Sequence, residues 1–305
     1  MRNVDVAVVG SLNLDLVVAV ERVPRAGETV LGGDLARYPG GKGANQAVAS
    51  GRLGASTAMC GRVGDDEAGQ ILLGSLRSAG VDVGGVTITA GVPTGTALIA
   101  VEETGDNAIV VSPGANARLT PADVEACAPV RNAPVVLLQL EVPLETVQAA
   151  ARIASGTVVL NPAPARPLPT SLLDDVDVLV PNEHELALLA DVELAADAGM
   201  DDIAAAARRL LVDLVVVTLG SRGALVVGSD WAQHVSAPRI EPVDTTAAGD
   251  SFCGALADGL ATGEPIVDAA AWAVRVGAAT TLAPGAQPSL PTNDEVEQRL
   301  GRVGG

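Results

Sequence analysis

Short runs of β-branched and aliphatic residues alternate along this chain with longer segments of helical periodicity. Residues 6–9 form the first run, which ends at a glycine and a serine and is typical of a buried strand. A strand at 58–60, a turn at 61–66 and a helix at 67–79 follow later. The alternation is clearest after residue 134, where strands are predicted at 135–140, 157–160, 178–180 and 214–219, and helices at 144–154 and 203–211. This order predicts an α/β fold with a doubly wound, mostly parallel sheet flanked by helices.

Four further short strands do not fit this alternation. Residues 16–20 and 28–31 flank a turn with proline and glycine, and residues 96–101 and 108–111 flank a polar segment typical of a hairpin. We expect them to form a small sheet, inserted into the main domain at about 14–38 and 93–111. No repeat or linker divides the chain, so residues 1–305 are predicted to form a single domain with this insertion.

The segment 244–250, DTTAAGD, leads into a helix predicted at 249–260, and a second helix is expected from 266 to about 281. Its small side chains leave the amides at the helix start bare, which favours binding of a phosphate group. A carboxylate such as Asp250 beside that site is suited to accept a proton from a hydroxyl that attacks the phosphate. An aspartate that only stabilises the helix N-terminus explains the pattern equally well, and the segment alone leaves both interpretations open.

A glycine-rich segment at 39–47, PGGKGANQA, opens a helix that continues to Gly54. Its three glycines allow backbone amides to approach a ligand, and Asn45 in the first turn can reach the same place. The segment is not a Walker A loop, because Gly43 stands where that motif requires serine or threonine after the lysine.

Polar side chains also follow several predicted strands. Asn13 and Asp15 come after the first strand, where ligands bind in doubly wound sheets, although a solvated loop is the simpler interpretation of these two alone. Asn182 and Glu185 are one helical turn apart and can face one site. Residues 284–289, PGAQPS, form a turn-rich loop whose carbonyl groups regular structure cannot all satisfy, so the loop is hydrated or coordinates a ligand.

Composition excludes several classes of partner. The net charge of −18 makes binding to nucleic acid or to an anionic membrane improbable. With only two Trp, one Tyr and one Phe, the chain also lacks aromatic side chains on which bases stack. Its three cysteines show no metal-binding spacing, and neither a signal peptide nor a transmembrane run is found, so a cytoplasmic protein with reduced thiols is expected.

The motifs together resemble a known family over nearly the whole length. Residues 40–47 and 244–250 are similar to the two signatures of the PfkB carbohydrate kinases, and NEHE at 182–185 matches that family's Asn-x-x-Glu motif. Within the family, residues 13–15, 41–45 and 284–289 look most like those of the ribokinases. The resemblance implies the ribokinase-like α/β fold with a small β lid, and ATP-dependent phosphorylation of a free sugar at its primary hydroxyl, D-ribose to D-ribose 5-phosphate.

The resemblance also implies roles for individual residues. Asp250 would be the catalytic base, and the amides of Ala247, Ala248 and Gly249 would form the anion hole for the transferred group. The residues implied to bind the sugar are Asn13, Leu14, Asp15, Gly41, Lys42, Gly43, Ala44, Asn45, Glu141 and Asp250. Those implied to bind ATP are Asn182, Thr218, Leu219, Gly220, Ser221, Arg222, Gly223, Gly249, Asp250 and Val274.

Two cations are implied as well. Glu185 would act through water on the Mg²⁺ that accompanies ATP. A K⁺ ion would lie beneath the anion hole, held by Asp244, Thr246, Thr280, Ala283, Gly285 and Ser289. A homodimer formed through the lid sheet is expected.

Alternatives remain at this stage. The same scaffold serves fructokinases and nucleoside kinases, although the scarcity of aromatic residues argues against a stacked nucleoside. Val274 is apolar where family members often carry a polar residue near the adenine, which leaves the nucleotide preference open. A sugar or nucleotide sensor without catalytic activity would not need Asp250 as a base.

Overall fold

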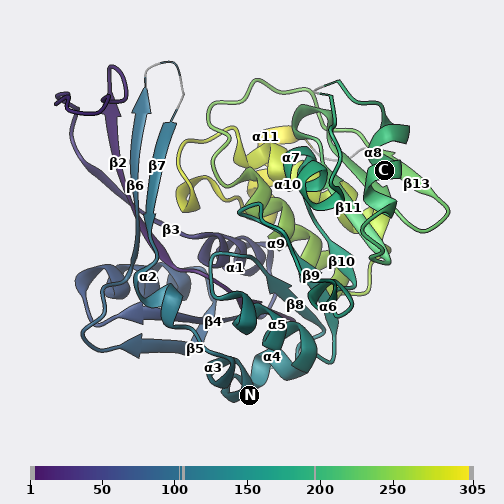
Figure 1. Ribbon diagram of the computed structural model, residues 1–305, viewed down its shortest axis with the longest axis horizontal. Helices are drawn as coiled ribbons and strands as arrows, with labels where there is room; N and C mark the ends of the chain where they lie inside the picture. The colour runs from purple at the N-terminus through teal and green to yellow at the C-terminus, as the bar shows by residue number, and fades with distance from the viewer. Residues whose placement is uncertain (1–3, 103, 105–106, 196, 302–305) are drawn as a thin grey trace.

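A nine-stranded sheet with helices on both faces forms the body of the molecule (Figure 1). The computed structural model describes residues 4–102, 104, 107–195 and 197–301. The strand order is β13-β12-β11-β10-β9-β8-β1-β4-β5, and all neighbours are parallel except β12 and β13 at one edge. The bounds are β1 Val6–Val9, β4 Thr57–Gly64, β5 Asp82–Thr89, β8 Val135–Leu138, β9 Thr157–Leu160, β10 Val178–Leu179, β11 Leu214–Thr218, β12 Ala224–Val227 and β13 Ala232–Val235. The predicted α/β fold is confirmed.

Each central strand contributes to two hydrophobic cores, one on either face of the sheet. In β1, Val6 and Val8 lie in one core, and Ala7 and Val9 in the other, as the two-residue period of a strand requires. The first core contains α1 Lys42–Leu53, α2 Glu67–Ser78, α9 Ala248–Ala261, α10 Ile266–Thr280 and α11 Asn293–Leu300. The second contains α3 Pro121–Ala126, α4 Ala128–Asn132, α5 Leu144–Ile153, α6 Thr170–Leu173, α7 Glu183–Ala190 and α8 Met200–Arg208. Within the described ranges, no helix has the length and apolarity needed to cross a bilayer.

A second sheet of four strands stands to one side of this body (Figure 1). Its order is β3-β2-β6-β7, with β2 Asn13–Val20, β3 Ala36–Gly40, β6 Gly95–Glu102 and β7 Asn107–Ser112. The strand predicted at 28–31 is wrong. Glu28 instead accepts a hydrogen bond from the amide of Arg25 and closes a turn, while β3 pairs with β2. No strand was predicted at 36–40, and Pro39 is tolerated there because β3 is an edge strand.

The turn predicted at 61–66 is also wrong for its first four residues, because β4 continues to Gly64 alongside β5. Gly61 serves close packing rather than a turn. A Cβ atom there would lie 2.5 Å from the side chain of Leu12 and 2.9 Å from the carbonyl oxygen of Gly10.

Helices α1 and α9 pack in backbone contact at Gly254. A Cβ atom at this position would lie 2.8 Å from the carbonyl oxygen of Gln46 and 2.7 Å from Cβ of Ala49. Any larger residue would separate the two helices. The segments 40–47 and 244–250, far apart in the sequence, therefore begin helices whose separation is fixed by a glycine.

Candidate active site

Asp250 lies in the first turn of α9, and its side chain is held by two amides from α1. Asn45 Nδ2 donates to Asp250 Oδ2 at 2.9 Å, and Gln46 Nε2 donates to Asp250 Oδ1 at 3.1 Å. The aspartate is only 7% exposed. Burial raises its pKa above the ordinary value, against the effects of Lys42 and Asn45, which lower it. A fixed carboxylate with a raised pKa is suited to accept a proton.

The start of α9 leaves backbone donors available beside this carboxylate. Ala247 is the N-cap in a left-handed conformation, with φ 60°, and no side chain caps the helix. Of the three amides expected to form the anion hole, that of Ala248 donates to the carbonyl of Thr245 at 3.3 Å. Within the described part of the chain, the amides of Ala247 and Gly249 meet no protein acceptor. The geometry thus presents donors at a helix N-terminus, where anions bind.

Acidic groups from three segments surround Lys42. Glu141 Oε2 accepts hydrogen bonds from Ser11 Oγ and from the amide of Lys42, at 2.5 and 3.1 Å. Burial, Glu141 and Asp250 together raise the pKa of Asp15 to about 7. Asp250 in turn raises the pKa of Lys42, which therefore keeps its charge despite burial. The predicted residues Asp15, Lys42, Glu141 and Asp250 thus share one electrostatic environment.

The glycine-rich segment is built differently from the expectation. The amide of Gly43 donates to Ser11 Oγ, and the amide of Ala44 donates to the carbonyl oxygen of Ser11, so neither faces a ligand. A Cβ atom at Gly43 would lie 2.6 Å from the amide nitrogen of Ser11. The glycine therefore allows α1 to start directly against the end of β1, which places Lys42 and Asn45.

Asn13 is oriented by a residue that sequence reasoning missed. Asn116 Nδ2 donates to Asn13 Oδ1 at 2.8 Å, and the same side chain bonds both the amide and the carbonyl of Leu12. Leu14, predicted beside it, has a buried side chain. Asn116 lies in a 3₁₀ helix, Gly114–Arg118, that carries no motif or periodicity by which it could have been identified.

A largely apolar cavity of about 460 Å³ lies between the second half of the main sheet and helices α9 and α10. Six residues predicted to bind ATP line it: Thr218, Gly220, Ser221, Gly223, Gly249 and Val274. Two others do not. Leu219 is buried in the second core, and Arg222 pairs with Glu183 and donates to the carbonyl of Ala198.

A second cavity of about 230 Å³ adjoins the first, since both are lined by Thr218, Thr245 and Gly249. It contains Lys42, Asn182, Glu185 and Asp250 among its lining residues. Asn182 and Glu185 also bond to each other at 2.8 Å as a capping box at the start of α7. Burial raises the pKa of Glu185. The larger apolar cavity therefore adjoins a small polar cavity that contains the candidate base.

The loop 284–289 lies against the segment that precedes α9. Asp244 Oδ2 accepts a hydrogen bond from the amide of Gly285 at 2.7 Å, and Asp244 Oδ1 accepts two from Thr246. Although burial alone would raise the pKa of Asp244, these hydrogen bonds lower it. Two expected K⁺ ligands use their hydroxyl protons within the chain. The hydroxyl of Thr280 donates to the carbonyl oxygen of Val276 or to the hydroxyl of Ser251, and that of Ser289 donates to the carbonyl oxygen of Ala286.

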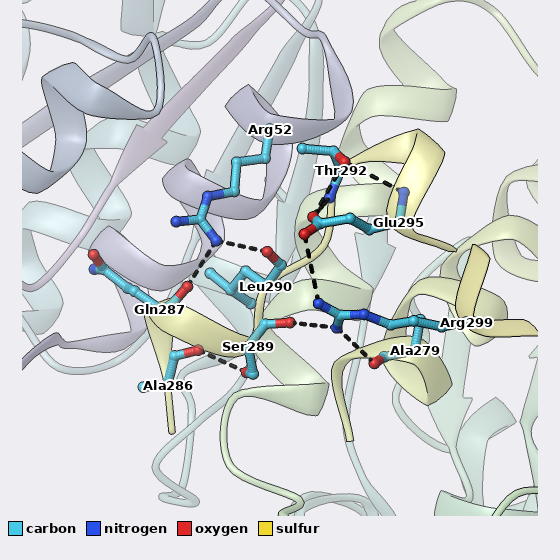
Figure 2. Close-up of polar contacts among 9 residues, drawn as sticks. All are labelled: Arg52, Ala279, Ala286, Gln287, Ser289, Leu290, Thr292, Glu295 and Arg299. Atoms are coloured by element: carbon cyan, nitrogen blue, oxygen red, sulfur yellow. Dashed lines mark hydrogen bonds and ion pairs between the residues drawn. The ribbon is translucent and has the colours of Figure 1, made fainter. Parts of the chain in front are cut away.

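Two arginines hold the other side of this loop (Figure 2). Arg52, from α1, donates from Nη1 to the carbonyl oxygens of Gln287 and Leu290 at 2.8 and 2.6 Å. Arg299, from α11, donates to those of Ala279 and Ser289, both at 3.0 Å. The loop is therefore fixed to three helices rather than left to solvent.

Comparison with known proteins agrees with this geometry. Residues 3–293 match the family model described as pfkB family carbohydrate kinase. A ribokinase of Bacillus subtilis (strain 168) is 40% identical over 304 residues, which cover 98% of this chain and all of that one. A deoxyribokinase of Salmonella typhi is 36% identical over 304 residues, covering 97% of this chain and 98% of that one. The structure of Arabidopsis thaliana ribokinase complexed with ribose and ATP superposes with a TM-score of 0.88 at 32% identity, covering 99% and 100% of the two chains.

Proposed function

This chain belongs to the pfkB family of carbohydrate kinases, and on that premise we propose that it transfers the terminal phosphoryl group of ATP to the 5-hydroxyl of D-ribose. The observation that carries the proposal is the position of Asp250. Its buried carboxylate lines the polar cavity, next to bare amides and to the entrance of the larger apolar cavity.

Each part of this arrangement has a role in phosphoryl transfer. The apolar cavity takes the adenine and ribose of ATP, and the phosphates extend past Gly249 into the polar cavity. Asp250 accepts the proton of the attacking hydroxyl, while Lys42 and the amides of Ala247 and Gly249 stabilise the charge on the transferred group. Asn13, Asp15 and Glu141 hold the remaining sugar hydroxyls. Because the acceptor is held by hydrogen bonds, position and orientation account for much of the rate.

A panel of acceptors tests the proposal. We expect the highest kcat/KM for D-ribose when D-ribose, 2-deoxy-D-ribose, D-fructose and adenosine are compared at saturating ATP and Mg²⁺. The deoxyribokinase relative makes 2-deoxy-D-ribose the main competitor. The two sugars differ only in the 2-hydroxyl, and a site built to bond a hydroxyl strongly rejects the analogue that lacks it. If another acceptor has a higher kcat/KM, that acceptor is the substrate instead of D-ribose. Absence of turnover with all four would contradict the kinase assignment.

Mg²⁺ fits the same cavity through Glu185. This carboxylate is buried beside Asp250 yet points into a polar space, where it can bond the water shell of an ion. When bound with ATP, Mg²⁺ neutralises negative charge on the phosphates.

A monovalent cation, K⁺, fits the loop beside Asp244. In the described residues no donor reaches the carbonyl oxygens of Ala283 or Gly285, and the carboxylate of Asp244 lies against the amide of Gly285. Oxygen ligands of this kind suit a large, weakly hydrated ion. The ion would preserve the turn that aims the amides at the start of α9.

We also propose that two copies associate through the small sheet. Leu98 in β6 and Val110 in β7 are directly paired and both exposed, so they form an apolar surface on this sheet. A double substitution of these two residues by lysine should convert a dimer into a monomer in sedimentation velocity. A wild-type enzyme that sediments as a monomer at micromolar concentration would contradict this proposal.

A further inference from the structure

Gln46 is completely buried next to Asp250, and no substrate-binding role accounts for it. Its Nε2 donates to Asp250 Oδ1 at 3.1 Å and to Asn161 Oδ1 at 3.2 Å. Its Oε1 accepts a hydrogen bond from Gln139 Nε2 at 2.6 Å. Gln46 therefore links the candidate base to a buried amide at the end of β8.

The orientation of the Gln46 amide decides whether it supports or repels the carboxylate. With Nε2 toward Asp250 it donates, whereas the flipped amide would place an oxygen against a carboxylate oxygen. Asn161 selects the supporting orientation, because its Nδ2 donates to the carbonyl oxygen of Val180 at 2.9 Å and leaves its Oδ1 to accept from Gln46 Nε2. Gln139 Nε2 then donates to the oxygen that Gln46 turns away from the carboxylate. Gln139 Oε1 is itself buried with no partner, which costs stability. Packing alone does not explain a glutamine at position 139, where an apolar side chain would avoid this cost.

We propose that Gln46, held by Asn161 and Gln139, is a positioning residue for the base: with Asn45 it fixes both oxygens of the Asp250 carboxylate for proton transfer. The inference rests on the proposed kinase function. Asn45 holds one oxygen and Gln46 the other, so the carboxylate cannot rotate about its bond to Cβ. Both donors also favour the ionised form, because an amide proton bonds a carboxylate more strongly than a carboxylic acid.

Other charged or titratable groups act on Asp250 from every side. Those that interact with it are Asp15 on β2, Lys42 on α1, Glu141 after β8, Glu185 on α7 and Cys253 on α9. The variants below leave all of these groups in place. A change in pH dependence can therefore be attributed to the lost hydrogen bond.

The test is the pH profile of kcat/KM for the full-length enzyme carrying Gln46→Met, which keeps the length of the side chain and removes the donor. We expect kcat to fall about 10-fold or more with KM for ribose within about twofold of wild type. The acid limb should move to higher pH by about one unit, because the ionised base has lost a stabilising donor.

Gln139→Met is the second variant. It leaves Gln46 in place but removes the donor that holds its Oε1, so Gln46 is held less firmly and we expect a smaller shift of the acid limb in the same direction. This variant decides the question if Gln46→Met does not fold. Thr146→Val is the matched control. Thr146 lies on α5, which packs in the other core, and the substitution removes its buried hydrogen bond to the carbonyl oxygen of Leu119. It should lower the melting temperature and leave the pH profile unchanged.

The outcomes separate a positioning role from a structural one. An acid limb at its wild-type pH in both glutamine variants would overturn the inference, whatever the loss of kcat or of melting temperature. Failure of the wild-type enzyme to phosphorylate any of the four acceptors would instead contradict the proposed function. A shift in Gln46→Met that Gln139→Met does not share would restrict the role to Gln46 and reject the part assigned to Gln139.

Discussion

Replacing Asp15 by asparagine should make the protein more stable while it weakens sugar binding. Burial, Glu141 and Asp250 raise the pKa of Asp15 to about 7. At pH 8 the folded protein must keep this carboxylate ionised in surroundings that oppose its charge. Asparagine has nearly the same shape and no charge, so it avoids that opposition.

The size of the effect follows from the pKa. An acid whose pKa rises on folding contributes stability that is fully present below the unfolded pKa, near 4, and is lost as pH rises through the folded pKa. With a folded pKa of about 7, the loss is about 4 kcal/mol at pH 8 and about 1.5–2 kcal/mol at pH 5. Asp15→Asn should therefore gain about 2–3 kcal/mol more at pH 8 than at pH 5.

Urea denaturation at the two pH values measures this difference directly, and calorimetric titration with ribose measures the functional loss. We expect ribose affinity to fall by about 10-fold to 100-fold at pH 8, because a charged acceptor for a sugar hydroxyl is removed. Asp34→Asn is the control, since it removes one negative charge from an exposed position. The reasoning is refuted if Asp15→Asn is no more stabilising at pH 8 than at pH 5, or if ribose binds it as tightly as wild type.

Three further predictions concern the base, the cation and the loop. Asp250→Asn should reduce kcat by about 10²–10⁴ in a coupled ADP assay with little change in ribose affinity, and a near wild-type kcat would exclude Asp250 as the base. K⁺ should activate the enzyme more than Na⁺ at matched ionic strength and constant Mg²⁺, and Asp244→Ala should remove most of this difference; equal rates in the two salts with wild type would exclude the cation site. Arg52→Met should lower the free energy of unfolding by about 2–3 kcal/mol in urea, because two backbone carbonyls lose a charged donor, and a loss below about 0.5 kcal/mol would show that water replaces the guanidinium.

Local sequence patterns were sufficient to predict an element when its structure depends only on residues close to it in the chain. The start of α9 was predicted within a residue, because DTTAAGD marks a helix N-terminus by itself. Strand β3 was not predicted, because it depends on pairing with β2, which periodicity in one segment does not reveal. The antiparallel edge formed by β12 and β13 escaped detection for the same reason.

Within the site, sequence reasoning found side chains in motifs and missed those that serve them. Asn45 and Gln46 are adjacent in α1, about 100° apart around the helix, and only Asn45 was expected to face the ligand. Both reach Asp250 because a carboxylate offers an oxygen to each. The amides of Gly43 and Ala44 were expected at a ligand, but they bond Ser11, a partner that lies 32 residues from Gly43 and that no local pattern indicates.

The close packing at Gly254 distinguishes residues that cannot change independently of one another from residues that can. Since no side chain fits between α1 and α9, a substitution there moves Asn45 and Asp250 apart, so the two helices can change at this contact only as one unit. Asp15, by contrast, belongs to β2 in the small sheet, whose strands pack beside the main body rather than within it. A lineage can therefore acquire a new acceptor through mutations in that sheet while it inherits the phosphoryl-transfer apparatus unchanged.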